Sequence, residues 1–245
     1  MRKLGFGFVA LKSLSQPKIW EYFFKNVDER FYNIYIHFKE YEHLGAFEKY
    51  RMNEIKPTSW GYFLEAQNLM FDKFLNDKDN SHFLVISDTT IPIKPFWHIY
   101  DNLEEGYSYI HKGDQSPPYG YDKTSKFVDK KFIKKTSMWV ILCRDHVKRF
   151  TEDLNYIEYF NYCLGEEYAY ISMLLKWGLE GEIKYKTTTH VRWPDKPSKN
   201  PCSLDDIGRE DFLSILNSDY FFARKFFKKS NILQECEKEL NEKIR

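Results

Sequence analysis

The sequence predicts an α/β fold in which a mostly parallel central sheet is flanked by helices. Residues 4–38 read as strand, helix and strand in succession, which is the start of a βαβ unit. Residues 83–86 (FLVI) form a continuous apolar run, as expected of a central strand covered on both faces. Because 42% of the 245 residues are hydrophobic and no linker-like stretch interrupts them, we expect a single domain.

The expected elements follow one another in the order that this fold requires. The expected strands are apolar or rich in β-branched and aromatic residues, and they cover residues 4–11, 32–38, 83–86, 138–143 and 182–193. The expected helices carry apolar residues at helical spacing or begin at a proline, and they cover a stretch from Pro17, residues 62–75, 95–103, a stretch from 145, and 166–177. Residues 113–126 are rich in Gly, Pro and polar residues, which is typical of a loop and fits a lid.

A polar turn ends the apolar strand at 83–86. Ser87, Asp88, Thr89 and Thr90 follow it directly. In open α/β sheets ligands bind in the crevice outside the carboxyl ends of the strands. Ser87 and Asp88 are therefore candidate site residues by position.

Charge and cysteine content exclude several classes of protein. Lys plus Arg (37) nearly cancels Asp plus Glu (36), so no overall field attracts a polyanion and no nucleic-acid partner is expected. The 4 cysteines are far apart, without the spacing of a zinc site or a disulfide framework. The apolar start is short and broken by Lys12, and nothing approaches the ~20 apolar residues of a membrane span. The expectation is a cytoplasmic protein without a membrane span.

Two adjacent acids, Glu166 and Glu167, begin the helix expected over 166–177. At about 100° per residue, Glu167 falls in the stripe of Ile171 and Leu174 and points inward, whereas Glu166 lies on the flank. An inward carboxylate here is either a cap stabilised by the helix dipole or a group aimed into a site. Glu166 suits the capping role better.

Seven segments match, in order, motifs of one known family. They are residues 32–37 (a strand ending in His), 59–61 (Ser-Trp-Gly), 83–103 (a strand ending in a polar turn with Ile-Pro), 135–139 (Lys-Thr-Ser-Met-Trp), 165–168 (Gly-Glu-Glu-Tyr), 190–193 (His-Val-Arg-Trp) and 222–226 (Phe-Ala-Arg-Lys-Phe). Each match alone is weak, but the ordered set is specific. The chain thus resembles the core-2/I-branching (β-1,6-N-acetylglucosaminyltransferase-like) family of glycosyltransferases.

The resemblance implies a GT-A-like (Rossmann-like) domain over residues 1–245, with a nucleotide-sugar-binding half at 1–110 and an acceptor and catalytic half at 127–230. It implies inverting transfer of a sugar, such as N-acetylglucosamine, glucose or xylose, from a UDP-sugar to a hydroxyl of a glycan or other acceptor. The second acid of the pair, Glu167, is the general base in this scheme. A microbial or viral source fits this short form, and a viral enzyme would work in the host cytoplasm.

The leaving diphosphate requires positive charge, and the resemblance assigns this role to Arg192 and Lys225. Arg224 is an alternative to Lys225, and Lys196 and Lys199 are alternatives to Arg192. No metal or other cofactor is expected, because Asp88 is the only acid in the turn after the strand at 83–86. The Asp77-Lys78-Asp79 sequence precedes that strand and lies at its wrong end for a metal-binding role.

The remaining predicted site residues complete the two subsites. His37 sits at a strand end near the expected donor site with Ser87 and Asp88. Lys94 is an acceptor contact by resemblance, and Trp139 is a candidate to stack on a sugar. The alternatives are a nucleotide- or carbohydrate-binding module without turnover, and a glucosyltransferase that acts on modified DNA.

Overall fold

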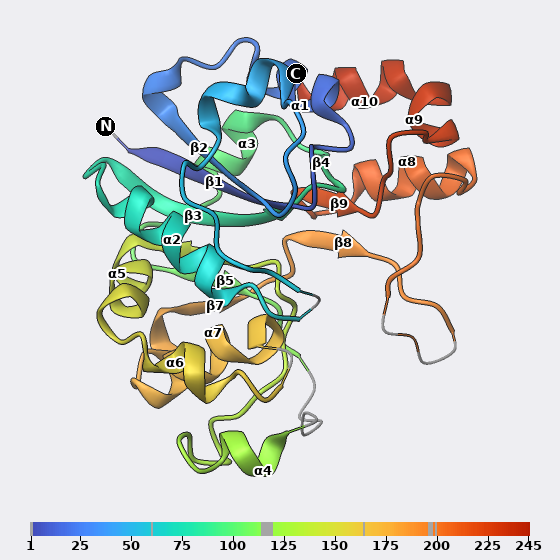
Figure 1. The fold of residues 1–245 in the computed structure, drawn as a ribbon. Coiled ribbons are helices and arrows are strands. Elements are labelled where there is room, and N and C mark those ends of the chain that lie inside the picture. Colours follow the sequence, from blue (N-terminus) through green and yellow to red (C-terminus); the bar gives the residue numbers. More distant parts are fainter. Residues whose placement is uncertain (1, 60, 114–119, 164, 196–197, 199) are drawn as a thin grey trace.

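A six-stranded sheet forms the centre of the protein in the computed structural model, which describes residues 2–59, 61–113, 120–163, 165–195, 198 and 200–245 (Figure 1). Its strand order is β2-β1-β3-β6-β5-β7. The strands are β1 (Lys3–Ala10), β2 (Tyr32–Phe38), β3 (Asn80–Ser87), β5 (Ser108–Ile110), β6 (Ile141–Cys143) and β7 (Ile183–Tyr185). Only β6 runs antiparallel to its neighbours β3 and β5, and the other pairs are parallel. The predicted α/β class with a mostly parallel sheet is confirmed.

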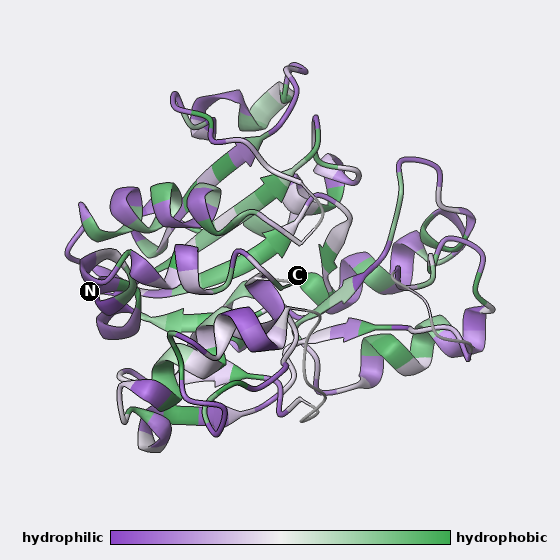
Figure 2. Cartoon of the chain, turned by 60° about the horizontal axis from the view of Figure 1, so that its bottom comes forward, coloured by the Kyte–Doolittle hydropathy of each residue, from purple (hydrophilic) through white to green (hydrophobic). Residues whose placement is uncertain are grey.

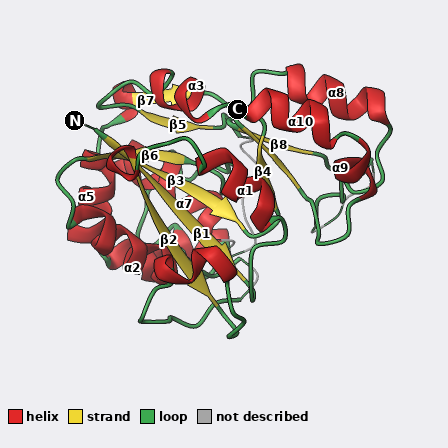
Figure 3. Cartoon of the chain, turned by 90° about the horizontal axis from the view of Figure 1, so that it is seen from above, coloured by secondary structure: helices red, strands yellow, loops and turns green. Residues whose placement is uncertain are grey.

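Helices cover both faces of this sheet, with α1 and α3 on one face and α2, α5 and α7 on the other (Figures 1 and 3). Each face has its own cluster of buried apolar side chains. The helices are α1 (Pro17–Phe24), α2 (Leu64–Leu75), α3 (Phe96–Asp101), α4 (Tyr121–Thr124), α5 (Arg144–Glu152), α6 (Asn155–Tyr159), α7 (Gly165–Lys176), α8 (Arg209–Asn217), α9 (Asn231–Glu235) and α10 (Glu237–Ile244). Short 3₁₀ helices cover Glu29–Phe31, Gly45–Tyr50 and Glu180–Glu182.

A second, three-stranded sheet has the order β4-β9-β8, and it lies beside α8, α9 and α10 (Figure 1). Its strands are β4 (Thr90–Pro92), β8 (Thr189–Val191) and β9 (Phe222–Arg224). The expectation of one strand over 182–193 is therefore wrong. The chain leaves the first sheet after β7, and the Thr188 carbonyl then accepts the N–H groups of Phe221 and Phe222, which directs β8 along β9.

Glycines in β1 leave room for aromatic rings from the neighbouring strand β3 and from the helix α2. A Cβ atom on Gly7 would lie 2.0 Å from Cζ of Phe83, and one on Gly5 would lie 2.5 Å from the Phe74 ring. Both phenylalanines are fully buried, so their rings fill the space that a side chain on β1 would occupy. Hydrophobic residues accordingly dominate the central strands, while hydrophilic and hydrophobic residues alternate along the helices (Figure 2).

The two predicted halves of the chain share one sheet. Residues 1–110 supply β1, β2, β3 and β5, and residues 127–230 supply β6 and β7. No helix in the described parts of the chain is both long and apolar enough to cross a bilayer. Trp60, Lys196, Lys199 and residues 114–119 of the expected loop lie outside the described residues.

Candidate functional site

Three neighbouring strands end in one row at the carboxyl edge of the central sheet. Val9 of β1 pairs with His37 of β2 on one side and with Ser87 of β3 on the other. Ser87 is buried, and its hydroxyl hydrogen-bonds the hydroxyls of Thr89 (3.2 Å) and Thr90 (2.8 Å). The structure therefore brings His37 and Ser87 together at the same edge of the sheet.

His37 is fully buried at this edge. Its Nε2 accepts the backbone N–H of Lys56 at 2.9 Å, so the chain after β2 folds back over the ring. Burial lowers the pKa of His37, and the Lys56 N–H is therefore bonded to a neutral imidazole at pH 7. Nδ1 of His37 has no hydrogen-bond partner among the described residues.

Asp88 fixes the loop that follows β1. Its carboxylate accepts the Leu11 N–H at 3.2 Å, and its carbonyl accepts the Ser15 N–H at 2.8 Å. Burial raises the pKa of Asp88, while the Leu11 N–H and the positive charges of Arg224 and Lys225 oppose that rise. Asp88 therefore faces the basic end of β9.

The end of β9 carries two cations with different surroundings. Arg224 is buried, with its guanidinium 4.2 Å from the centre of the Trp139 ring, and burial lowers its pKa to about 10. Lys225 is half-buried, and its ammonium lies 5.4 Å from the centre of the exposed Phe227 ring. Burial and the nearby Arg224 charge lower the pKa of Lys225. No residue in the described ranges forms a hydrogen bond or ion pair with the Lys225 ammonium.

Arg192 follows the strand that runs beside β9. Val191 of β8 pairs in parallel with Arg224, so Arg192 leaves β8 at the edge where Lys225 leaves β9. Arg192 is exposed, and its carbonyl accepts the Cys202 N–H at 2.8 Å. The structure thus brings Arg192 to the basic end of the site, while its alternatives Lys196 and Lys199 lie outside the described residues.

Glu167 lies in the first turn of α7, beside the segment that leads to Trp139. Its carbonyl accepts the Thr136 N–H at 2.7 Å, and its Oε2 lies 3.4 Å from the Lys135 ammonium. That contact is an ion pair without hydrogen-bond geometry. The Glu167 side chain is 12% exposed and largely packed, and its Oε2 is buried without a hydrogen-bond partner among the described residues.

The expected placement of Glu166 is wrong, whereas the Glu167 side chain is largely packed, as an inward orientation requires. Glu166, expected on the flank, is fully buried, and Glu167 alone among residues 165–174 is not buried. The helical-wheel argument fails because α7 is covered on all sides and has no solvent face that a wheel could identify. Glu166 is a cap, but for the neighbouring helix α2, because its carboxylate accepts the N–H of Phe63.

The segment 136–139 connects the two parts of the candidate site. At one end Thr136 bonds Glu167, and at the other end the Trp139 ring supports Arg224. Trp139 is 8% exposed, so the predicted stacking surface is occupied largely by Arg224. This segment therefore contacts both a carboxylate that can accept a proton and the cations at the end of β9 that can bind phosphate.

Lys94 lies apart from this group. Its ammonium donates to the Leu216 carbonyl in α8 at 2.7 Å, and the residue is buried. Burial lowers the pKa of Lys94. Because β4 runs antiparallel to β9, Lys94 follows the end of β4 that lies opposite Phe222, away from Arg224 and Lys225.

The acidic sequence Asp77-Lys78-Asp79 lies at the opposite end of β3, as predicted. The Asp77 carboxylate binds the Lys3 ammonium at 2.7 Å and the Asn33 amide at 2.9 Å. In the described parts of the chain, no group of three or more His, Cys, Asp or Glu side chains is arranged to hold a metal ion.

Two residues of the site were not among the predicted site residues. Lys135 belongs to the Lys-Thr-Ser-Met-Trp motif, and its ion pair with Glu167 joins segments about thirty residues apart in the chain. Arg224 was considered only as a substitute for Lys225. Nothing in the sequence indicates that it would be covered by Trp139, because that contact joins segments far apart in the chain.

Comparison with known proteins supports the resemblance. A family model described as "Core-2/I-Branching enzyme" matches residues 4–216, which includes Glu167 and Arg192 but ends before Lys225. A protein named Glycosyltransferase BC10 from Oryza sativa subsp. japonica is 22% identical over 236 residues. That alignment covers 81% of this chain and 59% of the rice protein, so the chain spans less than two thirds of its relative's length.

Proposed function

Because the chain belongs to the core-2/I-branching enzyme family, we propose that it is a glycosyltransferase that moves a sugar from a UDP-sugar to a hydroxyl of a glycan or glycoconjugate. The observation that carries this proposal is the segment of residues 136–139, which contacts Glu167 at one end and Arg224 at the other. Transfer needs both groups, because a proton must be taken from the acceptor while negative charge grows on the leaving group.

Glu167 acts as the general base in the proposed mechanism. The acceptor hydroxyl gives its proton to the Glu167 carboxylate as its oxygen attacks the anomeric carbon of the donor. The bond from that carbon to the diphosphate breaks on the opposite face, through an oxocarbenium-like transition state, and the configuration is inverted. The Oε2 atom of Glu167 supports this role, because it has no hydrogen-bond donor among the described residues and can accept a proton.

Lys225, with Arg192 and Arg224 beside it, neutralises the diphosphate as it leaves. Lys225 suits direct contact, since its ammonium has no described partner, whereas Arg224 is already packed on Trp139. The donor is expected to lie along the row of His37, Ser87 and Asp88 at the sheet edge. These cations supply the charge that a divalent metal would otherwise supply, so we propose transfer without a metal.

The sugar transferred is proposed to be N-acetylglucosamine, glucose or xylose. A panel of UDP-sugars, each tested for thermal stabilisation of the protein, identifies the donor, because a ligand that binds only the folded state raises its stability. The selected donor then enters a transfer assay with glycan acceptors.

The experiment that tests the mechanism compares Glu167→Gln with Glu166→Gln. Glutamine at 167 keeps the size of the side chain but cannot accept a proton, so kcat should fall by about 10²- to 10⁴-fold while donor affinity stays nearly constant. Glutamine at 166 keeps an oxygen for the Phe63 N–H, and transfer should change by less than about threefold. Reversed effects would show that Glu167 is not the base. Donor binding by a wild-type protein that neither transfers nor hydrolyses the sugar would favour a binding module.

A further inference from the structure

Glu166 links the beginnings of two helices. α2 starts at Leu64, and its N-cap residue, Phe63, supplies no side-chain cap. The Glu166 carboxylate, in the first turn of α7, accepts the Phe63 N–H instead. A carboxylate at a helix N-terminus is favoured by the free N–H groups and by the helix dipole. Glu166 therefore caps α2 from a different helix.

The same junction holds the tight turn before α2. Ser59 and Tyr62 exchange backbone hydrogen bonds of 3.1 and 3.0 Å, which closes the turn. The Gly61 carbonyl accepts the Gly165 N–H at 3.1 Å. Two consecutive residues of α7 thus hydrogen-bond this region: Gly165 bonds the turn, and Glu166 bonds the start of α2.

The packing at this junction leaves little room for adjustment. A Cβ atom on Gly165 would lie 3.0 Å from Cδ1 of Leu64, so glycine allows the two helix ends to approach closely. Next to this contact, Glu166 and Glu65 line a cavity of about 80 Å³.

The Glu166 carboxyl group lies in surroundings that disfavour its charged form. The side chain is fully buried, and its second oxygen has no hydrogen-bond partner among the described residues. Burial raises the pKa of Glu166 to about 7, against the opposing effect of the Phe63 N–H. Glutamine would accept the same N–H without the cost of burying a charge.

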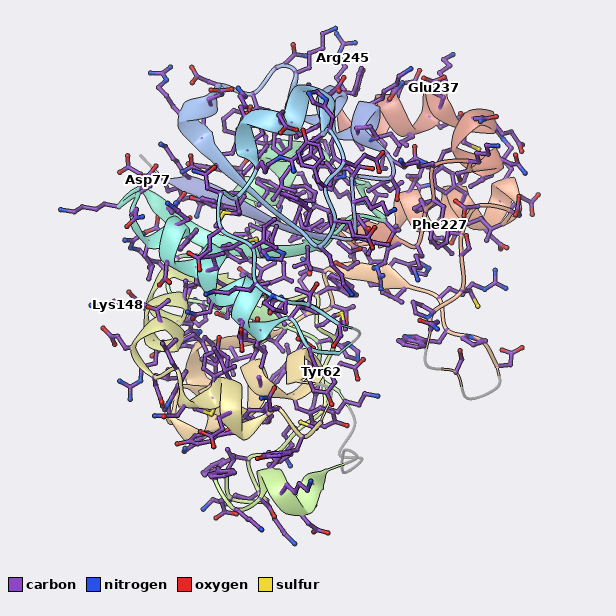
Figure 4. The ribbon with its side chains drawn as sticks, in the orientation of Figure 1. Tyr62, Asp77, Lys148, Phe227, Glu237 and Arg245 are labelled. Atoms are coloured by element: carbon purple, nitrogen blue, oxygen red, sulfur yellow. The ribbon has the colours of Figure 1, made fainter. Side chains whose placement is uncertain are left out.

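The position of the junction indicates what the fastening serves. Glu167, the proposed base, is the next residue of α7 and faces Lys135. Tyr62 closes the fastened turn and is 40% exposed, and Figure 4 labels it near the start of α2. Tyr62 and Glu166, the neighbour of Glu167 in α7, line the same cavity, and an exposed aromatic ring is suited to pack against a sugar ring.

We propose that Glu166 is a positioning residue for the acceptor side of the site. By accepting the Phe63 N–H it holds the Ser59–Tyr62 turn on the N-terminal end of α7, which fixes the Tyr62 ring relative to Glu167. This inference rests on the proposed glycosyltransferase function, and it adds Tyr62 as an acceptor contact.

The structural step is tested by amide hydrogen exchange on the full-length protein. Glu166→Leu removes the acceptor oxygen, whereas Glu166→Gln keeps it. In the Leu variant, exchange at Phe63 and in the turn should rise about tenfold or more while α5 is unchanged, and the Gln variant should stay within about twofold of wild type. Unchanged exchange in the Leu variant, or a rise of equal size throughout the protein, would overturn the proposal.

The functional step is tested by acceptor kinetics, with Glu65→Leu as the matched control because Glu65 lines the same cavity but is exposed. Glu166→Leu should raise the acceptor KM by about tenfold and the donor KM by less than about twofold, and Glu166→Gln should restore the acceptor KM. Tyr62→Ala should also raise the acceptor KM, and the double variant should show less than the product of the two effects, because both act on one contact.

The outcomes separate the two proposals. The positioning role alone would be refuted if the wild type transfers sugar normally but Glu166→Leu leaves the acceptor KM unchanged. The same conclusion would follow if the effects of Glu166→Leu and Tyr62→Ala on the acceptor KM were independent. A wild-type protein that transfers no sugar from any donor that binds it would refute the proposed function, and with it the acceptor role of Tyr62.

Discussion

The free energy of unfolding of Glu166→Gln, measured relative to wild type, should be more favourable at alkaline pH than at acidic pH. Burial raises the pKa of Glu166 from its ordinary value of 4.5 to about 7. The folded state therefore keeps a proton that the unfolded state releases, and wild-type stability falls as pH rises from about 4.5 to about 7. Glutamine does not titrate, so this loss should be absent from the variant.

The magnitude follows from the interval between the two pKa values. At about 1.4 kcal/mol per pH unit, the interval from 4.5 to about 7 corresponds to roughly 3 kcal/mol of lost stability above pH 7. The side chain is fully buried, so solvent screening does not reduce this figure greatly. The difference in unfolding free energy between Glu166→Gln and wild type should therefore be about 3 kcal/mol more favourable at pH 8.5 than at pH 4.5.

Urea unfolding at the two pH values measures this quantity. Comparing the variant with wild type at each pH cancels the titration of all other groups. Glu65→Gln removes a carboxyl from the exposed side of the same cavity and should differ from wild type by less than about 0.5 kcal/mol at either pH. A pH-dependent difference below about 1 kcal/mol for Glu166→Gln, or one of opposite sign, would refute the reasoning, because it would show that the buried carboxyl is not held neutral.

Two further predictions concern the donor. Lys225→Ala should weaken binding of UDP by about 1.5 to 3 kcal/mol in calorimetry and leave uridine binding nearly unchanged, because the lost contact is to phosphate. The control is Lys228→Ala, because the Lys228 ammonium pairs with Glu42 at 2.8 Å on the surface. Equal losses of UDP and uridine binding in Lys225→Ala would point to a folding defect. Transfer should survive EDTA, since cations surround the proposed diphosphate site; loss of activity that Mn²⁺ restores would make Asp88 a metal ligand instead.

The fold was largely predictable because its pattern is local. A continuous apolar run such as Phe83 to Ile86 specifies a strand covered on both faces, and all four residues are buried in β3. The strand expected over 182–193 failed for a non-local reason. Whether residues 182–193 form one strand depends on β9, which lies about thirty residues later in the chain and pairs with β8 in the second sheet.

The site was predictable where position along a strand decides it. Ser87 and His37 follow from the rule that parallel strands end at one edge of a sheet, and the structure places them beside the same residue of β1. The burial of Glu166 was not predictable, because it depends on where α2 begins. A helical wheel assumes one buried face, and that assumption does not hold for a helix enclosed on all sides.

The distinction between Arg224 and Lys225 also depends on a contact that no local pattern contains. Both cations stand at the end of β9 and both interact with the charge of Asp88. Trp139, which reaches Arg224 from the segment before β6, covers its guanidinium at 4.2 Å and leaves the Lys225 ammonium beside the exposed Phe227. A guanidinium that is already stacked and desolvated contributes positive potential, while an ammonium without a described partner can move to meet phosphate oxygens. Lys225 is therefore the residue we expect to bind the diphosphate directly, and Arg224 the one that strengthens the field around it.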